Sequence, residues 1–146
     1  MRWLLALTAL LCTTGCGLLQ RAHEVEQHRT LARLVRLMEE TLWLLESTGA
    51  DRETLLRHAA RRSAPDDPVS LETLCDRLTG PALDLCRRFD DGLGTTPLPQ
   101  QRAHCESCIA EGRRLLTRSR TRLAERRRLT LSLPLLGGLF AVILFF

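Results

Sequence analysis

The sequence contains no lysine, no asparagine and no tyrosine, and aromatic residues make up only 4% of its 146 positions. The three missing residue types share A/T-rich codons, so we attribute their absence to a GC-rich bacterial genome rather than to chemistry. All 21 basic residues are therefore arginine, and the formal net charge is +4. The scarcity of aromatic side chains argues against a platform that stacks on sugars or nucleic-acid bases.

Sequence motifs of catalysis are missing as well. The chain has no GxSxG, no HExxH and no glycine-rich phosphate-binding loop. Its four histidines are scattered over predicted helices, where each is expected to be a surface residue. We therefore predict that the protein is not an enzyme, holds no metal and needs no cofactor other than a covalent lipid near its N-terminus.

The first residues have the order of a secretory signal. Arg2 is followed by an apolar run over residues 3–11, then by the small residues of 13–15, and then by Cys16. This order and this length are typical of an export signal rather than of a membrane span. The stretch resembles the lipobox of bacterial lipoproteins, in which a small residue precedes the acylated cysteine.

The lipoprotein resemblance covers residues 1–17 only. It implies a signal peptide over residues 1–15 and a lipid on Cys16. The residue after Cys16 is Gly17 and not aspartate, which by the same resemblance implies sorting to the outer membrane. Two alternatives stay open. The leader could remain as an uncleaved signal anchor, or an ordinary signal peptidase could remove it without lipidation.

Apolar residues after the leader recur at spacings of three and four, which predicts helices and no strands. We expect an all-α fold, a small disulfide-stapled helical bundle between an N-terminal signal or lipid anchor and a C-terminal hydrophobic tail helix. The predicted helices cover residues 18–48, 52–62, 71–78, 81–91 and 99–128. The predicted regions are a signal peptide (1–15), a lipid anchor and polar stalk (16–30), a helical domain (31–128) and a membrane-associated tail (129–146).

Four further cysteines, Cys75, Cys86, Cys105 and Cys108, lie on the apolar faces of their predicted helices. Cysteines of an exported protein usually pair, and four of them allow three connectivities. An antiparallel hairpin around the loop at 92–99 would place Cys86 level with Cys105. We therefore predict the pairs Cys86–Cys105 and Cys75–Cys108.

Three other interpretations of these cysteines stay open. The CxxC spacing of Cys105 and Cys108 occurs in thiol oxidoreductases, although these place the first thiol at a helix N-terminus. Zinc could bind Cys105, Cys108 and Cys86 with either Cys75 or His104, and the CxxC followed by an apolar tail is similar to zinc-binding anti-sigma factors. Finally, the thiols could simply be buried and free.

The end of the chain combines positive charge with an apolar tail. Residues 113–128 contain eight arginines and one glutamate, and residues 129–146 carry no charge. Eighteen uncharged residues are just long enough to span hydrocarbon. We predict that Arg126, Arg127 and Arg128 face anionic lipid head groups and that the protein binds no nucleic acid. Such arginines normally stay on the cytoplasmic side, which conflicts with export.

These features predict a non-enzymatic, membrane-anchored envelope lipoprotein, with its domain in the periplasm and the outer membrane favoured. It would act as a scaffold or binding partner for another envelope protein through the amphipathic helix at 31–45, which has more apolar surface than a thin stripe needs. The alternative is a tail-anchored cytoplasmic regulator that binds zinc or senses redox state. A third, enzymatic interpretation rests on the CxxC alone.

Overall fold

A computed structural model of the chain describes the backbone of residues 2–49 and 51–145 and the side chains of residues 15, 19–49 and 51–126. Its helices are α1 (Arg2–Thr48), α2 (Arg52–Ser63), α3 (Leu71–Arg77), α4 (Pro81–Gly92) and α5 (Leu98–Phe145). The described residues contain no strand. The predicted all-α fold is therefore confirmed.

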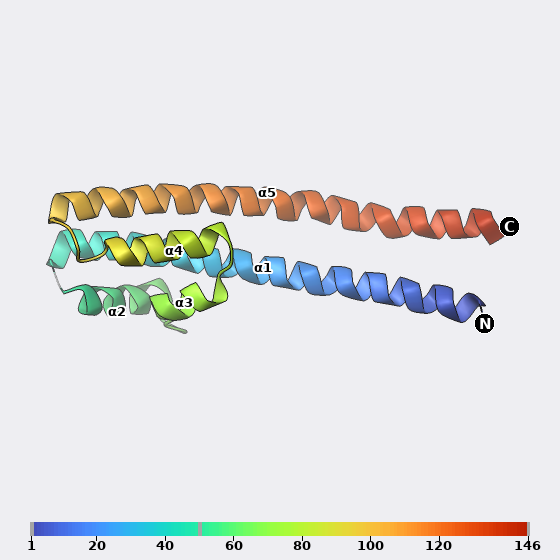
Figure 1. Cartoon of the computed structure of the whole chain (residues 1–146), viewed down its shortest axis with the longest axis horizontal. Helices are drawn as coiled ribbons and strands as arrows, with labels where there is room; N and C mark the ends of the chain where they lie inside the picture. Colours follow the sequence, from blue (N-terminus) through green and yellow to red (C-terminus); the bar gives the residue numbers. More distant parts are fainter. Residues whose placement is uncertain (1, 50, 146) are drawn as a thin grey trace.

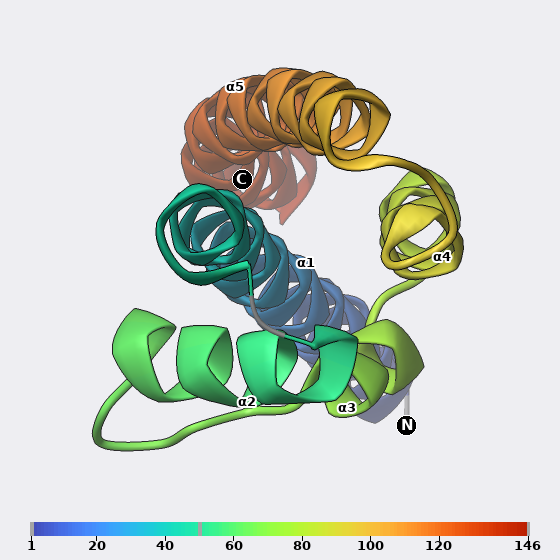
Figure 2. The ribbon, with the colours of Figure 1, turned by 90° about the vertical axis from the view of Figure 1, so that its left-hand side faces the viewer.

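The two long helices, α1 and α5, lie antiparallel along the whole molecule, so that both chain termini are at the same end (Figure 1). The three short helices pack at the opposite end. Viewed along the long axis, α1 lies between α5 and the pair formed by α2 and α3, while α4 bridges α5 and α3 (Figure 2). We call α2–α4 with residues 27–48 and 98–119 the head, and residues 2–26 and 120–145 the hairpin arms.

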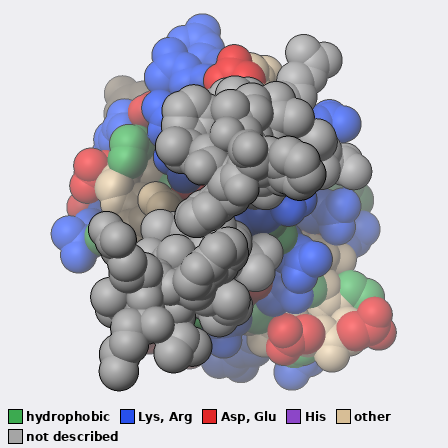
Figure 3. Space-filling model, turned by 90° about the vertical axis from the view of Figure 1, so that its right-hand side faces the viewer, with side chains coloured by type: hydrophobic (Ala, Val, Ile, Leu, Met, Phe, Trp, Pro, Cys, Tyr) green, Lys and Arg blue, Asp and Glu red, His purple; other side chains and the backbone are tan. Residues whose placement is uncertain are grey.

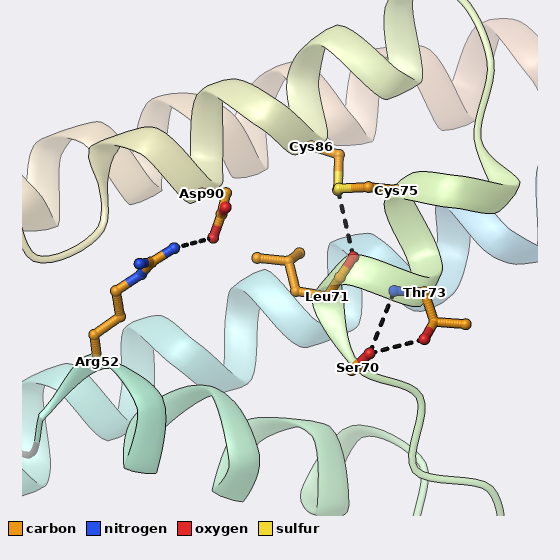
Figure 4. Close-up of a disulfide and its surroundings, with 7 residues drawn as sticks. All are labelled: Arg52, Ser70, Leu71, Thr73, Cys75, Cys86 and Asp90. Atoms are coloured by element: carbon orange, nitrogen blue, oxygen red, sulfur yellow. Dashed lines mark hydrogen bonds and ion pairs between the residues drawn. A yellow bond between two sulfur atoms is a disulfide. The ribbon is translucent and has the colours of Figure 1, made fainter.

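Local sequence signals place the ends of the short helices where we predicted them. α1 ends before Gly49, whose φ of 56° suits glycine. Ser70 caps α3, because its hydroxyl accepts a hydrogen bond from the backbone N–H of Thr73 at 3.3 Å (Figure 4). Gly80, with φ of 60°, reverses the chain, and Pro81 is the first residue of α4.

Other predicted boundaries differ from the structure. α1 begins at Arg2 rather than near residue 18, and α5 continues to Phe145 rather than ending near residue 128. Asp51 occupies the predicted N-cap of α2, but its side chain makes no capping hydrogen bond. Within the described residues, no helix has the length and apolarity to cross a membrane. The predicted leader and tail fall outside the side chains described.

The head has one apolar core to which every helix contributes. Leu34 and Met38 of α1 are completely buried, and so is Phe89 of α4. Burial of one such side chain contributes about 1.5–3 kcal/mol. Further fully buried side chains are Leu37, Thr41, Leu55, Leu74, Leu85, Cys86 and Cys105. The hydroxyl of Thr41 donates to the carbonyl of Leu37 at 2.7 Å, so this buried polar group is satisfied.

α1 and α5 approach each other closely at Gly112. A Cβ atom at this position would lie 2.8 Å from Val35 Cγ2 and 3.4 Å from Leu85 Cδ2, so no larger residue fits without displacement. Polar contacts fix the register on both sides of this point. Glu39 accepts from Arg113 at 2.7 Å, and His28 Nδ1 is 3.0 Å from Ser119 Oγ.

The structure corrects the predicted disulfides. Cys75 of α3 and Cys86 of α4 form a disulfide with a Cα–Cα distance of 5.9 Å (Figure 4), whereas Cys105 and Cys108 are free and buried. Both predicted pairs, Cys86–Cys105 and Cys75–Cys108, are therefore wrong. The tight reversal at Gly80 folds α4 directly against α3 and brings two cysteines 11 positions apart to the same level.

Cys105 stays free although α4 and α5 pack side by side. The ring of His104 lies against Gly92 and 3.0 Å from the carbonyl oxygen of Arg88, and Arg88 pairs with Glu111 at 3.0 Å. The sulfur of Cys86 is directed to the neighbouring helix α3, where it is bonded to Cys75.

We predict that Gly112→Leu will separate α1 from α5 and lower the free energy of unfolding by about 1–3 kcal/mol, as overpacking does. The measurement is chemical denaturation of the full chain in non-ionic detergent, followed by circular dichroism. Ala110→Leu is the matched control, because Ala110 is exposed on the same helix. Equal stability of the two variants would contradict the close approach.

We also predict that Cys75→Ala/Cys86→Ala will lower the free energy of unfolding by about 3 kcal/mol, the chain-entropy contribution of a short disulfide loop. Wild-type protein should lose the same amount on reduction, and the double variant should not respond to reductant. A reductant effect that persists in the double variant would show that another cysteine pair carries the bond.

Candidate functional site

The basic end of the hairpin is the first candidate site, because it combines the predicted membrane contacts. Arg126 of α5 forms an ion pair with Glu24 of α1 at 2.6 Å, which joins the two arms. The side chains of Cys16, Arg127 and Arg128 lie outside those described. Their predicted lipidation and lipid contacts therefore stay predictions.

The antiparallel register determines which segments of the two arms are neighbours. Glu24 lies level with Arg126, His28 with Ser119, and Glu39 with Arg113. In each pair the two residue numbers add up to nearly the same value, so the two helices stay in register along the described part. Because both helices continue with the same rise per residue, the backbone near Cys16 is level with the first turns of the predicted tail.

Arginines dominate the described part of the arm in α5 and the adjoining head. Between residues 113 and 126, α5 carries six arginines and one glutamate. Among the described residues, Arg114, Arg118, Arg120 and Arg122 are exposed and form no ion pair. Viewed from the end at which the termini lie, arginine side chains are visible at several places on this face, with acidic side chains between some of them (Figure 3). The arrangement can attract an anionic surface or partner.

The second candidate site is the pair of free thiols on α5. Cys105 and Cys108 are buried where α5 packs on α4. Burial raises the pKa of Cys105 from 9.0 to about 11, and the neighbouring Cys108 and Glu106 add to the effect. Burial likewise raises the pKa of Cys108. At neutral pH both groups are therefore protonated thiols, the unreactive form.

His104 lies beside these two thiols. Its Nε2 lies 3.0 Å from the carbonyl oxygen of Arg88 and 3.6 Å from the Cys108 sulfur. The ring therefore satisfies a carbonyl near the C-terminal end of α4. Over the described part of the chain, no three histidine, cysteine or acidic side chains are placed to hold a metal ion. The zinc interpretation thus gains no support from Cys75, Cys86 or His104.

Most apolar side chains of the segment 31–45, which we predicted to bind a partner, are buried within the head. Leu31, Leu34, Leu44 and Leu45 are buried in the common core. Only Trp43 remains 51% exposed, and the guanidinium of Arg62 lies 4.2 Å from its ring centre. Whether this helix binds another protein stays a prediction, now reduced to the surface around Trp43.

Three features of these sites were missed by the sequence reasoning. The pairing of Cys75 with Cys86 had a signal in the Gly80-Pro81 reversal that lies between them. The contact of His104 with Gly92 had none, because it depends on the register between two helices. Nor did the sequence distinguish the arginines that pair from those that do not.

Comparisons with protein-family models, with curated proteins and with solved structures found no match to this chain.

We predict that Cys105 in the folded protein reacts with iodoacetamide at a rate that rises about tenfold per pH unit up to about pH 11. The raised pKa of Cys105 lowers its thiolate fraction roughly 100-fold at neutral pH. Labelling is slow there because only the thiolate reacts with iodoacetamide. Peptide mapping should show labelling of residues 105 and 108 without reductant once the chain is unfolded, but labelling of Cys75 and Cys86 only after reduction. Fast labelling that levels off below pH 9 would contradict this assignment.

Proposed function

We propose that this protein is a non-enzymatic, membrane-anchored lipoprotein of the bacterial cell envelope that holds its helical head as a scaffold or binding partner. The observation that carries the proposal is the antiparallel arrangement of α1 and α5 (Figure 1). It brings the predicted lipid anchor at Cys16 and the predicted apolar tail at 129–146 to one end of the molecule. Two weak anchors in one membrane give stable attachment where a single one does not.

If both predicted anchors enter one membrane, the length of the arms sets the distance between the head and that membrane. The head begins at Gln27, which donates to the carbonyl of Arg77 at 2.7 Å. From this level to the start of the predicted tail, α5 covers about 9 residues, or roughly 14 Å. The arms thus act as a spacer, with the basic residues of α5 at the membrane end.

The disulfide supports an oxidising compartment for the head. A cysteine pair that bonds between two short helices is common in exported proteins and rare in the cytosol. The buried, protonated state of Cys105 and Cys108 is consistent with a structural role. The disulfide supports a periplasmic head.

One observation favours the alternative, a tail-anchored cytoplasmic regulator that senses metal or redox state. The arginines of α5 lie on the head side of the predicted tail, and positive residues normally stay in the cytoplasm. This alternative requires reduced Cys75 and Cys86, and a metal-binding role would require them to move toward Cys105 and Cys108.

The two proposals predict different masses for protein taken from native membranes. The lipoprotein should begin at Cys16 and carry acyl groups, with one disulfide and two thiols that react on unfolding. Cys16→Ser should lose the acyl mass, whereas Cys12→Ser is the matched control and should keep it. A full-length chain with reduced Cys75 and Cys86 would overturn the lipoprotein and favour the cytoplasmic regulator.

A further inference from the structure

A shallow groove lies along α5 beside its contact with α4. It has a volume of about 320 Å³ and is lined by Ser107, Ala110, Glu111, Arg114, Leu115 and Arg118. These residues recur every three or four positions, so they form a single stripe on the helix. Eleven residues of helix correspond to a strip about 16 Å long.

The groove carries positive charge that no partner within the described chain neutralises. Arg114 and Arg118 are exposed and unpaired, and Arg122 continues the row one turn further. The one acidic residue of the groove, Glu111, is already bound by Arg88 through hydrogen bonds of 3.0 and 3.2 Å. Leu115 is only partly buried against the core and leaves an apolar surface at the base of the groove.

The distance to the membrane decides what this charge can attract. If the anchors lie as in the proposed function, on which this step rests, Arg118 is about 16 Å and Arg114 about 22 Å from the start of the tail. Electrostatic attraction in physiological salt is screened beyond about 8 Å. Arg114 and Arg118 thus lie along the side of the head rather than at the start of the tail, which favours a protein segment over lipid as the source of complementary charge.

We propose that this groove binds an acidic amphipathic helix of a partner protein. Carboxylates four residues apart on the partner would face Arg114, Arg118 and Arg122, because both rows then repeat at the same distance. An apolar side chain of the partner would cover Leu115, as in other helix-in-groove complexes. Guanidinium groups suit this role because they bind carboxylates through two parallel hydrogen bonds.

A synthetic helical peptide tests the groove directly. The probe has glutamates at positions i, i+4 and i+8 with a leucine on the same face, and the control peptide has glutamines instead. The full chain in non-ionic detergent should bind the acidic probe at least tenfold more tightly, and added salt should weaken binding. Equal binding of the two peptides would overturn the proposal.

Two variants separate the groove from net charge. Arg114→Glu/Arg118→Glu should reduce affinity for the acidic peptide at least tenfold. The control Arg36→Glu/Arg61→Glu makes the same charge change at two exposed, unpaired arginines outside the groove and should keep affinity within about twofold. Equal losses in both double variants would show non-specific attraction and overturn the proposal. These peptide measurements do not depend on membrane attachment, so they can succeed even if the lipoprotein proposal fails.

A photo-crosslinker at position 118 in living cells identifies the natural occupant. The proposal expects an adduct with another protein, attached within a segment that has acidic residues four positions apart. An adduct with lipid, an adduct with a second copy of this chain, or no adduct would overturn it.

Discussion

The close contact between α1 and α5 is the constraint on which the rest of the molecule depends. At Gly112 the helices approach so closely that a single added methyl group would meet Val35. Burial of Leu34 and Met38 requires this approach, because α1 has α5 on one side and α2 and α3 on the other. The same contact fixes the antiparallel register that brings both chain ends together. Stability of the head and placement of the predicted anchors therefore have one common cause.

Local signals predicted the helices well, whereas contacts between helices could not be predicted. Ser70 and Gly80 act on their own neighbours, so the sequence was enough to place the ends of α3 and α4. Cysteine pairing depends on how far one helix slides along another. The reversal at Gly80 gave α3 and α4 a tight register, while the loop before α5 left its register open. The predicted pair Cys86–Cys105 failed for this reason.

In the candidate sites, too, the residues could be predicted from the sequence but their contacts between helices could not. The sequence identified the arginines of α5, but not which of them would be neutralised by α1 or α4. Arg113 and Arg126 pair with glutamates of α1 across the helix contact, whereas Arg114 and Arg118 point away from that contact. Since every Lys or Arg position of the chain is an arginine, residue type carries no information here. Only the face of the helix separates structural arginines from those available to a partner.

The thiols show why position in a helix matters more than a motif. Catalytic CxxC thiols need a helix N-terminus or a nearby positive charge, which stabilises thiolate. Cys105 lies about two turns after the start of α5 at Leu98 and is buried in the core, where burial raises its pKa to about 11. Nε2 of His104 is shared between the carbonyl oxygen of Arg88 at 3.0 Å and the Cys108 sulfur at 3.6 Å. The spacing is that of a redox motif, but the surroundings favour the neutral thiol, as expected of residues that fill a core.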